Sequence, residues 1–175
     1  RFGAHVTLAQ PEGYRLMEPS LEAAQANAEA SGGSFTVMHD MDEAFAGADV
    51  VYPKSWGPYD LMLERVDANR SKDTEALRDI ERRALERNAA HRDWICDERR
   101  MGLTRDAGAL YMHCLPADIG AEVSPGVMEQ FRVDLAREAN KKVFAIMALL
   151  TAAKATQVKA ALERAARTDQ GGSAR

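Results

Sequence analysis

Apolar positions along the chain change spacing repeatedly, and the changes predict strands and helices in turn. Residues 4–9, 34–38 and 48–52 are short runs of strand formers, and residues 21–30 and 41–46 between them are rich in helix formers. Strands that alternate with helices in this way are typical of a parallel sheet joined by right-handed crossovers. We therefore expect an α/β fold with helices on the faces of a parallel sheet.

Local signals mark the ends of these helices. Pro19 stands where a first helical turn tolerates a residue without an N–H group, and Gly32 can end that helix in a left-handed conformation. Asp40, followed three residues later by Glu43, is typical of a capped helix start.

The next stretch, residues 60–91, is dense in charge and poor in strand formers. Leu77, Ile80 and Ala84 recur at helical spacing, which predicts one surface helix of roughly twenty residues.

Five further elements follow, and the last is the longest. Residues 93–96 and 109–114 read as strands, with a helical turn at 97–102 between them. A further helical turn opens at Ser124-Pro125, and residues 135–166 then read as one long C-terminal helix.

Composition narrows the function classes. The chain has 175 residues, of which 46% are hydrophobic and 29% charged, and its formal charge is −4. These values are typical of one globular domain, and the lack of a clustered positive excess argues against general nucleic-acid binding. The longest apolar run, residues 143–153, is too short to span a bilayer, so no membrane partner is expected. Two cysteines are too few for a disulfide scaffold, so we expect a cytoplasmic protein.

The chain begins with Arg1 and runs directly into the strand at 4–9. Two explanations are open at this point. The start reflects processing, or the chain is the C-terminal part of a longer protein.

Two predicted strand ends carry candidate chemistry, since ligands of parallel sheets bind beyond the carboxyl ends of the strands. The first is a Pro- and Gly-bounded loop with Lys54, Ser55 and Trp56, although a rigid turn plugged by Trp56 explains it equally well. The second holds His113 and Cys114, which could polarise a carbonyl or form a nucleophilic pair. Adjacent strand residues point to opposite faces, which favours a site made of the histidine side chain and neighbouring backbone groups.

No cofactor or metal is expected. The chain has neither a G-x-G-x-x-G nor a G-x-x-x-x-G-K-[ST] motif, which counts against an oxidoreductase domain that binds a dinucleotide. The histidines are scattered, with no cysteine pair at zinc spacing: His5, His39, His91 and His113.

Several segments resemble one enzyme family. Residues 109–118 contain His-Cys-Leu-Pro after an apolar strand and resemble the signature of the ornithine-type carbamoyltransferases. Residues 49–56 resemble an upstream segment of that family, residues 1–14 a strand of its amino-acid-binding domain, and residues 138–141 the start of its last helix. The resemblance covers residues 1 to about 155.

The resemblance implies a fold and an activity. These enzymes transfer a carbamoyl group from carbamoyl phosphate to an amine, act as trimers, and have two α/β domains per chain. Residues 1–166 would be the C-terminal, amino-acid-binding domain, a Rossmann-like parallel sheet with helices on both faces and a long C-terminal helix. This domain would be incomplete at its N-terminus, and residues 167–175 would be a flexible tail. The Ser-x-Arg-Thr phosphate loop of the N-terminal domain does not occur in the sequence, so we expect this part alone to be inactive.

The resemblance also implies residue roles. His113 would hydrogen-bond the carbamoyl carbonyl and stabilise the developing oxyanion. Cys114 and the carbonyl of Leu115 would hold the carbamoyl NH₂ group and the attacking amine, and Pro116 would follow a cis peptide bond. Lys141 or Lys142 would take the place of an arginine that binds the carbamoyl oxygen, and the register leaves both open.

Departures from the family concern the substrate. Ornithine enzymes have an aspartate where this chain has Lys54, and a Ser-Met-Gly loop where it has Gly57-Pro58-Tyr59. A reversed charge disfavours the cationic amine of plain ornithine. Lysine before Ser55 and Trp56 is more similar to the N-acetylornithine carbamoyltransferases and to a related, knotted group. An acidic or acylated amine substrate is therefore expected. The alternative is a non-catalytic α/β ligand-binding or regulatory module that kept the fold.

Overall fold

The computed structural model describes residues 2–54 and 57–154. The chain forms two compact units, residues 1–132 and 133–175. The elements follow in this order: β1 (His5–Ala9), α1 (Glu18–Ser31), β2 (Ser34–Met38), α2 (Met41–Phe45), β3 (Val50–Val51), α3 (Tyr59–Ser71), α4 (Thr74–Ala89), α5 (Glu98–Met101), the short 3-10 helix η1 (Arg105–Ala107), β4 (Leu110–Tyr111) and α6 (Pro125–Lys154).

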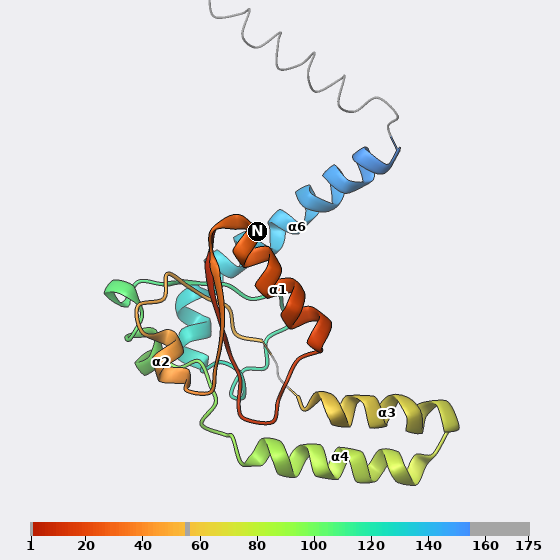
Figure 1. Cartoon of the computed structure of the whole chain (residues 1–175). Coiled ribbons are helices and arrows are strands. Elements are labelled where there is room, and N and C mark those ends of the chain that lie inside the picture. Colours follow the sequence, from red (N-terminus) through yellow and green to blue (C-terminus); the bar gives the residue numbers. More distant parts are fainter. Residues whose placement is uncertain (1, 55–56, 155–175) are drawn as a thin grey trace, which may run out of the picture. The chain divides into compact units, whose positions relative to one another are not determined.

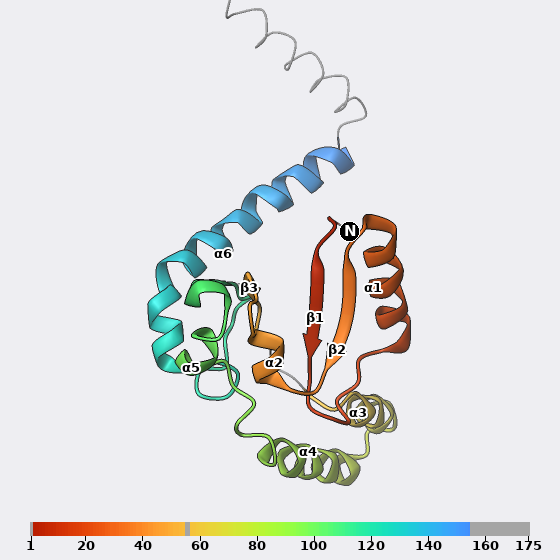
Figure 2. The ribbon, with the colours of Figure 1, turned by 60° about the vertical axis from the view of Figure 1, so that its left-hand side comes forward.

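The strands are parallel, as the alternating pattern predicts. In the first pair, β1 and β2 lie side by side in register from His5 opposite Ser34 to Ala9 opposite Met38, with α1 packed alongside β2 (Figure 2). In the second, Val51 of β3 lies opposite Tyr111 of β4. The α/β class is confirmed. In the described residues, however, the strands form two separate pairs and not one continuous sheet, and β3 and β4 are only two residues long.

The ends of α1 and α2 follow the local signals. Gly32 ends α1 with φ 74°, a left-handed conformation that glycine adopts without steric strain. Asp40 caps α2 by accepting a hydrogen bond from the backbone N–H of Glu43 at 2.9 Å.

The charge-dense stretch forms two helices, so the prediction of one was wrong. The break lies at Lys72, whose φ of 58° ends α3. Asp73 then caps α4, and its carboxylate accepts hydrogen bonds from the N–H groups of Glu75 and Ala76. The helical spacing was correct, but it did not reveal this left-handed residue followed by a cap.

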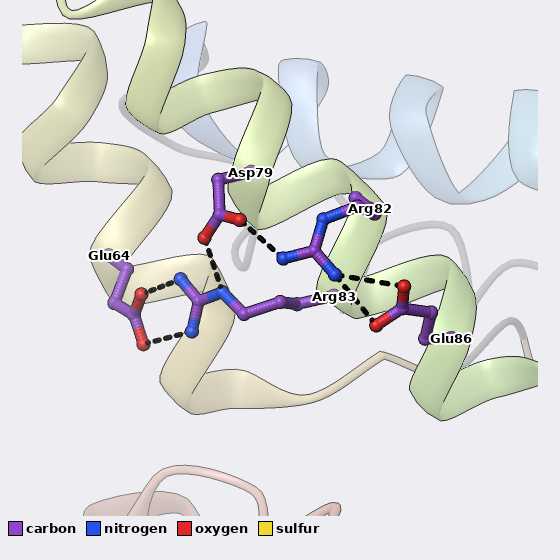
Figure 3. A network of polar contacts seen from close by, with 5 residues as sticks. All are labelled: Glu64, Asp79, Arg82, Arg83 and Glu86. Atoms are coloured by element: carbon purple, nitrogen blue, oxygen red, sulfur yellow. Dashed lines mark hydrogen bonds and ion pairs between the residues drawn. The ribbon is translucent and has the colours of Figure 1, made fainter.

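The two helices pack side by side as a hairpin (Figures 1 and 2). Leu61 and Ala68 of α3 meet Ile80 of α4 in a buried apolar cluster. Charged side chains cover the outside, where Arg83 bridges Glu64 of α3 and Asp79 of α4 (Figure 3). These ionic groups are largely exposed, so most of the stability of the hairpin comes from the apolar cluster.

The later elements differ from expectation in their bounds. The expected strand at 93–96 is a turn that pairs only through Cys96, in an isolated bridge to Val123. The expected strand at 109–114 is only the two residues of β4, and the turn at Ser124-Pro125 is the beginning of α6 itself. The end of the long helix and the expected tail lie outside the described residues. Within the described ranges, no helix combines the length and apolar character needed to cross a membrane.

Candidate functional site

The pairing of β3 with β4 brings two candidate loops to the same edge. Val51 and Tyr111 are register partners, and the N–H of Met112 donates to the carbonyl of Val51 at 2.9 Å. Because the strands are parallel, the segments that follow β3 and β4 leave the pair in the same direction. The loop that contains Lys54 and the segment that begins at His113 therefore start next to each other.

The ring of His113 is fully buried between aromatic side chains. It has no exposed surface. It stacks on Tyr52 with ring centroids 6.5 Å apart, and on Tyr111 at 6.4 Å. β4 has ended before His113, so the strict alternation of a strand does not govern where this side chain lies.

Both ring nitrogens of His113 have partners within the chain. The backbone N–H of Leu115 donates to Nδ1 at 2.9 Å, so Nδ1 is an unprotonated acceptor. The proton of the neutral ring is then on Nε2, which donates to Oε1 of Glu122 at 2.9 Å.

Glu122 is a site residue that the sequence analysis missed. It is 3% exposed, and Oε1 also accepts the N–H of Asp118 at 2.6 Å. Its other oxygen, Oε2, is buried without a hydrogen-bond partner in the described part of the chain. An acidic residue directly before the apolar Val123 was the available signal, but many exposed glutamates share that pattern.

The backbone of Glu122 is held by a buried cysteine. The N–H of Cys96 donates to the carbonyl of Glu122 at 2.9 Å, and the N–H of Ser124 donates to the carbonyl of Cys96 at 2.8 Å. Burial raises the pKa of the Cys96 thiol to about 12. Cys96 therefore acts as an inert anchor for this segment.

The turn after His113 is partly exposed. The Leu115–Pro116 peptide bond is cis, as expected, and Leu115 has a φ of 44°. Leu115 is 39% exposed, and its carbonyl oxygen accepts no hydrogen bond from residues that the structure describes. Cys114 is half-buried. The turn thus offers the Leu115 carbonyl as an acceptor for an N–H group.

A cavity of about 390 Å³ lies beyond the ends of β1 and β3. Its charged lining residues within the described ranges are Arg15, Lys54 and Glu122. The remaining walls are mainly apolar and aromatic and include Tyr14, Tyr52, Tyr59 and Trp94. Glu122 therefore contacts both this cavity and the ring of His113. Such a cavity suits a small molecule with an apolar body and an anionic group.

The structure brings together part of the predicted site. Lys54 lines the cavity, and His113, Cys114, Leu115 and Pro116 form the adjacent turn. Ser55 and Trp56 lie outside the described residues. Lys141 and Lys142 are exposed in α6, in the second unit, and their roles stay predictions.

The expected contact between His113 and a carbonyl group also stays a prediction. To make this contact, the ring would have to exchange one of its two internal hydrogen bonds for the ligand. Residues 2–54 and 57–154 contain no cluster of His, Cys, Asp and Glu side chains arranged to hold a metal ion.

Known proteins with similar sequences are carbamoyltransferases. The family described as aspartate/ornithine carbamoyltransferase, Asp/Orn binding domain, matches residues 1–153. The "Putative carbamoyltransferase YgeW" of Escherichia coli K12 is 49% identical over 170 residues, covering 94% of this chain and 43% of that protein. The N-acetylornithine carbamoyltransferase of Xanthomonas campestris is 33% identical over 153 residues, covering 87% of this chain and 40% of that protein. The chain thus spans less than half the length of these curated relatives.

Solved structures agree with the sequence matches. An N-acetyl-L-ornithine transcarbamylase mutant complexed with carbamyl phosphate and N-succinyl-L-norvaline matches with a TM-score of 0.54 and 34% identity, covering 72% of this chain and 33% of that one. An acetylornithine transcarbamylase complexed with acetylcitrulline matches with the same TM-score and identity, covering 71% of this chain and 32% of that one. The chain belongs to the aspartate/ornithine carbamoyltransferase family, in which it forms the amino-acid-binding domain.

Proposed function

We propose that this domain is the second-substrate-binding half of a carbamoyltransferase that transfers a carbamoyl group from carbamoyl phosphate to the amine of an acidic or acylated amino acid. One observation carries the proposal. Lys54 and Glu122 line a single cavity, and Glu122 also bonds to His113 in the turn that ends at the cis Leu115–Pro116 bond. A substrate in this cavity would therefore lie beside the turn.

The charges of the cavity favour an anionic group on the substrate. Arg15 and Lys54 are cationic, whereas Glu122 is already hydrogen-bonded to His113 and Asp118. A carboxylate or the carbonyl of an acyl group would bind Lys54, and an ammonium group in its place would be repelled. Structures similar to this domain contain N-succinyl-L-norvaline and acetylcitrulline, both acylated amino acids.

In the proposed reaction, the amine nitrogen attacks the carbamoyl carbon. A new N–C bond forms, the C–O bond to phosphate breaks, phosphate leaves with that electron pair, and the amine loses a proton. The Leu115 carbonyl would accept an N–H from the transferred NH₂ group and, with Cys114, orient it. Lys141 or Lys142 would contact the carbamoyl oxygen. The phosphate would be held by the other half of the full-length protein.

The family relationship also motivates an assembly. We expect the full-length protein to be a cytoplasmic homotrimer, since the enzymes that it resembles act as trimers. Sedimentation equilibrium of the full-length protein measures this mass directly, and a monomer would contradict the expectation.

The test of the substrate class uses the full-length protein, carbamoyl phosphate and four amines: aspartate, ornithine, N-acetyl-L-ornithine and N-succinyl-L-ornithine. We expect turnover with an acidic or acylated amine. Lys54→Asp should raise the KM for that amine by about tenfold or more and improve the use of ornithine, because the charge at the cavity is reversed.

Lys72→Asp makes the same charge change at an exposed position between α3 and α4 and serves as the control. An unchanged substrate preference in Lys54→Asp would overturn the substrate assignment. A complete absence of carbamoyl transfer with every amine would favour the non-catalytic ligand-binding module.

A further inference from the structure

We propose that Glu122 is a positioning residue that fixes the tautomer of His113 and, through it, the turn at Leu115. The proposal deepens the proposed function and rests on it. It assigns His113 a task inside the protein, whereas the family resemblance implies a direct contact with the carbamoyl group.

The two hydrogen bonds of the His113 ring have defined directions. A backbone N–H can only donate, so the bond from Leu115 requires a lone pair on His113 Nδ1. The neutral ring then carries its proton on Nε2, where the carboxylate oxygen of Glu122 accepts it. The order is therefore Leu115 N–H to His113, and His113 to Glu122.

The alternative tautomer of His113 does not fit these two partners. A proton on Nδ1 would face the N–H of Leu115, and the lone pair on Nε2 would face an oxygen of Glu122. Both hydrogen bonds would be lost together. His113 is fully buried and Glu122 is 3% exposed, so water cannot replace either bond. Glu122 therefore selects the tautomer that holds the turn.

Glu122 is itself held in place by neighbouring groups. Oε1 accepts from Asp118 as well as from His113, which orients the carboxylate. The carbonyl of Glu122 and the N–H of Ser124 both form hydrogen bonds with the backbone of Cys96. The acceptor is thus held rigidly behind the ring, as a positioning group needs to be.

The consequence lies at the exposed side of the turn. The Leu115 N–H is used internally, while the Leu115 carbonyl accepts nothing from the described residues and could accept an N–H group of a ligand. A turn held in this way presents the carbonyl in one orientation. A loosened turn would present it in several, and transfer would slow because orientation contributes to the rate.

Two substitutions of His113 separate positioning from direct contact. In His113→Asn, the amide oxygen lies near the place of Nδ1 and can still accept the Leu115 N–H. In His113→Gln, the amide lies near the place of Nε2 and the acceptor for Leu115 is lost. For the full-length enzyme with its best amine, we expect kcat of His113→Gln to be about tenfold or more below that of His113→Asn, with a smaller change in the KM for the amine. Equal rates, or a slower asparagine variant, would overturn the proposal in favour of direct contact through Nε2.

Substitutions of Glu122 test the other end. Glu122→Gln keeps an acceptor oxygen for Nε2, and Glu122→Leu removes it. We expect the leucine variant to lose about tenfold or more in kcat relative to the glutamine variant. Glu129→Gln changes an exposed glutamate in the first part of α6 and serves as the matched control. Equal kcat in the two Glu122 variants would contradict the positioning role.

A second readout does not depend on activity. Hydrogen exchange of the Leu115 amide in the full-length protein should be slow in the wild type and in His113→Asn, and about tenfold or more faster in His113→Gln and Glu122→Leu. Exchange that is equally fast in all four proteins would overturn the positioning role even if carbamoyl transfer is observed. The expected exchange pattern without carbamoyl transfer would support the Glu122–His113–Leu115 arrangement and reject the proposed function alone.

Discussion

The hydroxyl of Tyr14 donates a hydrogen bond to Oδ1 of Asn88 at 3.0 Å, across 74 positions of sequence. This bond ties the loop after β1 to the last turn of α4. Arg87 adds to the connection, since its guanidinium lies 5.6 Å from the centroid of the Tyr14 ring. Because Tyr14 also lines the cavity, the hairpin of α3 and α4 supports one of the cavity walls.

Tyr14→Phe removes this hydrogen bond and keeps the ring. We expect the free energy of unfolding to fall by about 1 kcal/mol, because the half-buried Asn88 side chain loses its donor. Denaturant unfolding measures the change. Tyr59→Phe is the control, since its hydroxyl has no hydrogen bond to a described residue. An equal effect in both variants would contradict the role of the Tyr14 bond.

Tyr14 should also ionise late. Burial raises its pKa above the usual value of 10.0, and this effect outweighs the opposing charge of Arg87. The raised pKa favours the folded state below pH 10, and this contribution is lost as the pH rises through the folded pKa. Ultraviolet titration of wild type and Tyr14→Phe should therefore differ in the most alkaline tyrosine transition. If the transition that Tyr14→Phe removes lies at the ordinary tyrosine pKa, the pKa of Tyr14 is not raised and the prediction is wrong.

Asp42 should make the stability of the folded protein depend on pH in the acid range. Its carboxylate accepts two hydrogen bonds from Arg99, at 2.6 and 2.7 Å, and one from Arg100 at 2.7 Å. The hydrogen bonds from Arg99, and to a smaller extent the one from Arg100, hold the pKa of the Asp42 carboxylate well below its usual range. The resulting stabilisation is present above the unfolded pKa of about 3.9 and is lost as the pH falls through the folded pKa.

Asp42→Asn tests this dependence. The variant should melt below the wild type at pH 7, and the gap should narrow at the acid end of the range, about pH 2 to 3. Asp67→Asn serves as the control, since Asp67 is 77% exposed and contacts Arg70 only at 3.4 Å. A gap that stays constant from pH 7 to the acid end would show that the charge of Asp42 is not the cause.

Cys96 should resist alkylation in the folded protein. Its side chain is fully buried, and a thiol pKa of about 12 leaves on the order of one thiolate in ten thousand at pH 8. Cys114 is half-buried and should react first. Mass spectrometry after iodoacetamide treatment should find Cys96 labelled only after denaturation. Labelling of Cys96 in the native state would mean that the bridge to Val123 opens readily.

The helical hairpin should depend on its apolar cluster. Ile80 is 5% exposed against Leu61 and Ala68, so Ile80→Ala should lower the free energy of unfolding by about 2–4 kcal/mol. Leu85 lies in the same helix but is 65% exposed, and Leu85→Ala should change stability by less than about 0.5 kcal/mol. Arg82→Ala, which removes part of the surface network in Figure 3, should have a small effect that salt weakens further. A similar loss in the two apolar variants would argue that the hairpin is not held by this cluster.

Local patterns were sufficient for much of the fold. The strands β1 and β2 and the helices α1 and α2 lie where spacing, Gly32 and Asp40 predict them, because helix propensity and capping act over a few neighbouring residues. The same reasoning missed the break at Lys72, since a left-handed lysine has no sequence signature comparable to that of glycine.

For the candidate site too, the sequence predicted one part and the tertiary structure decided the rest. The run from His113 to Pro116 is contiguous, so the sequence alone identified this segment as a candidate, and the family resemblance implied its cis bond. Only the tertiary structure joined it to Glu122 and placed Lys54 on the neighbouring cavity. Strand pairing and buried hydrogen bonds decide these contacts, and both depend on partners that lie far apart along the chain.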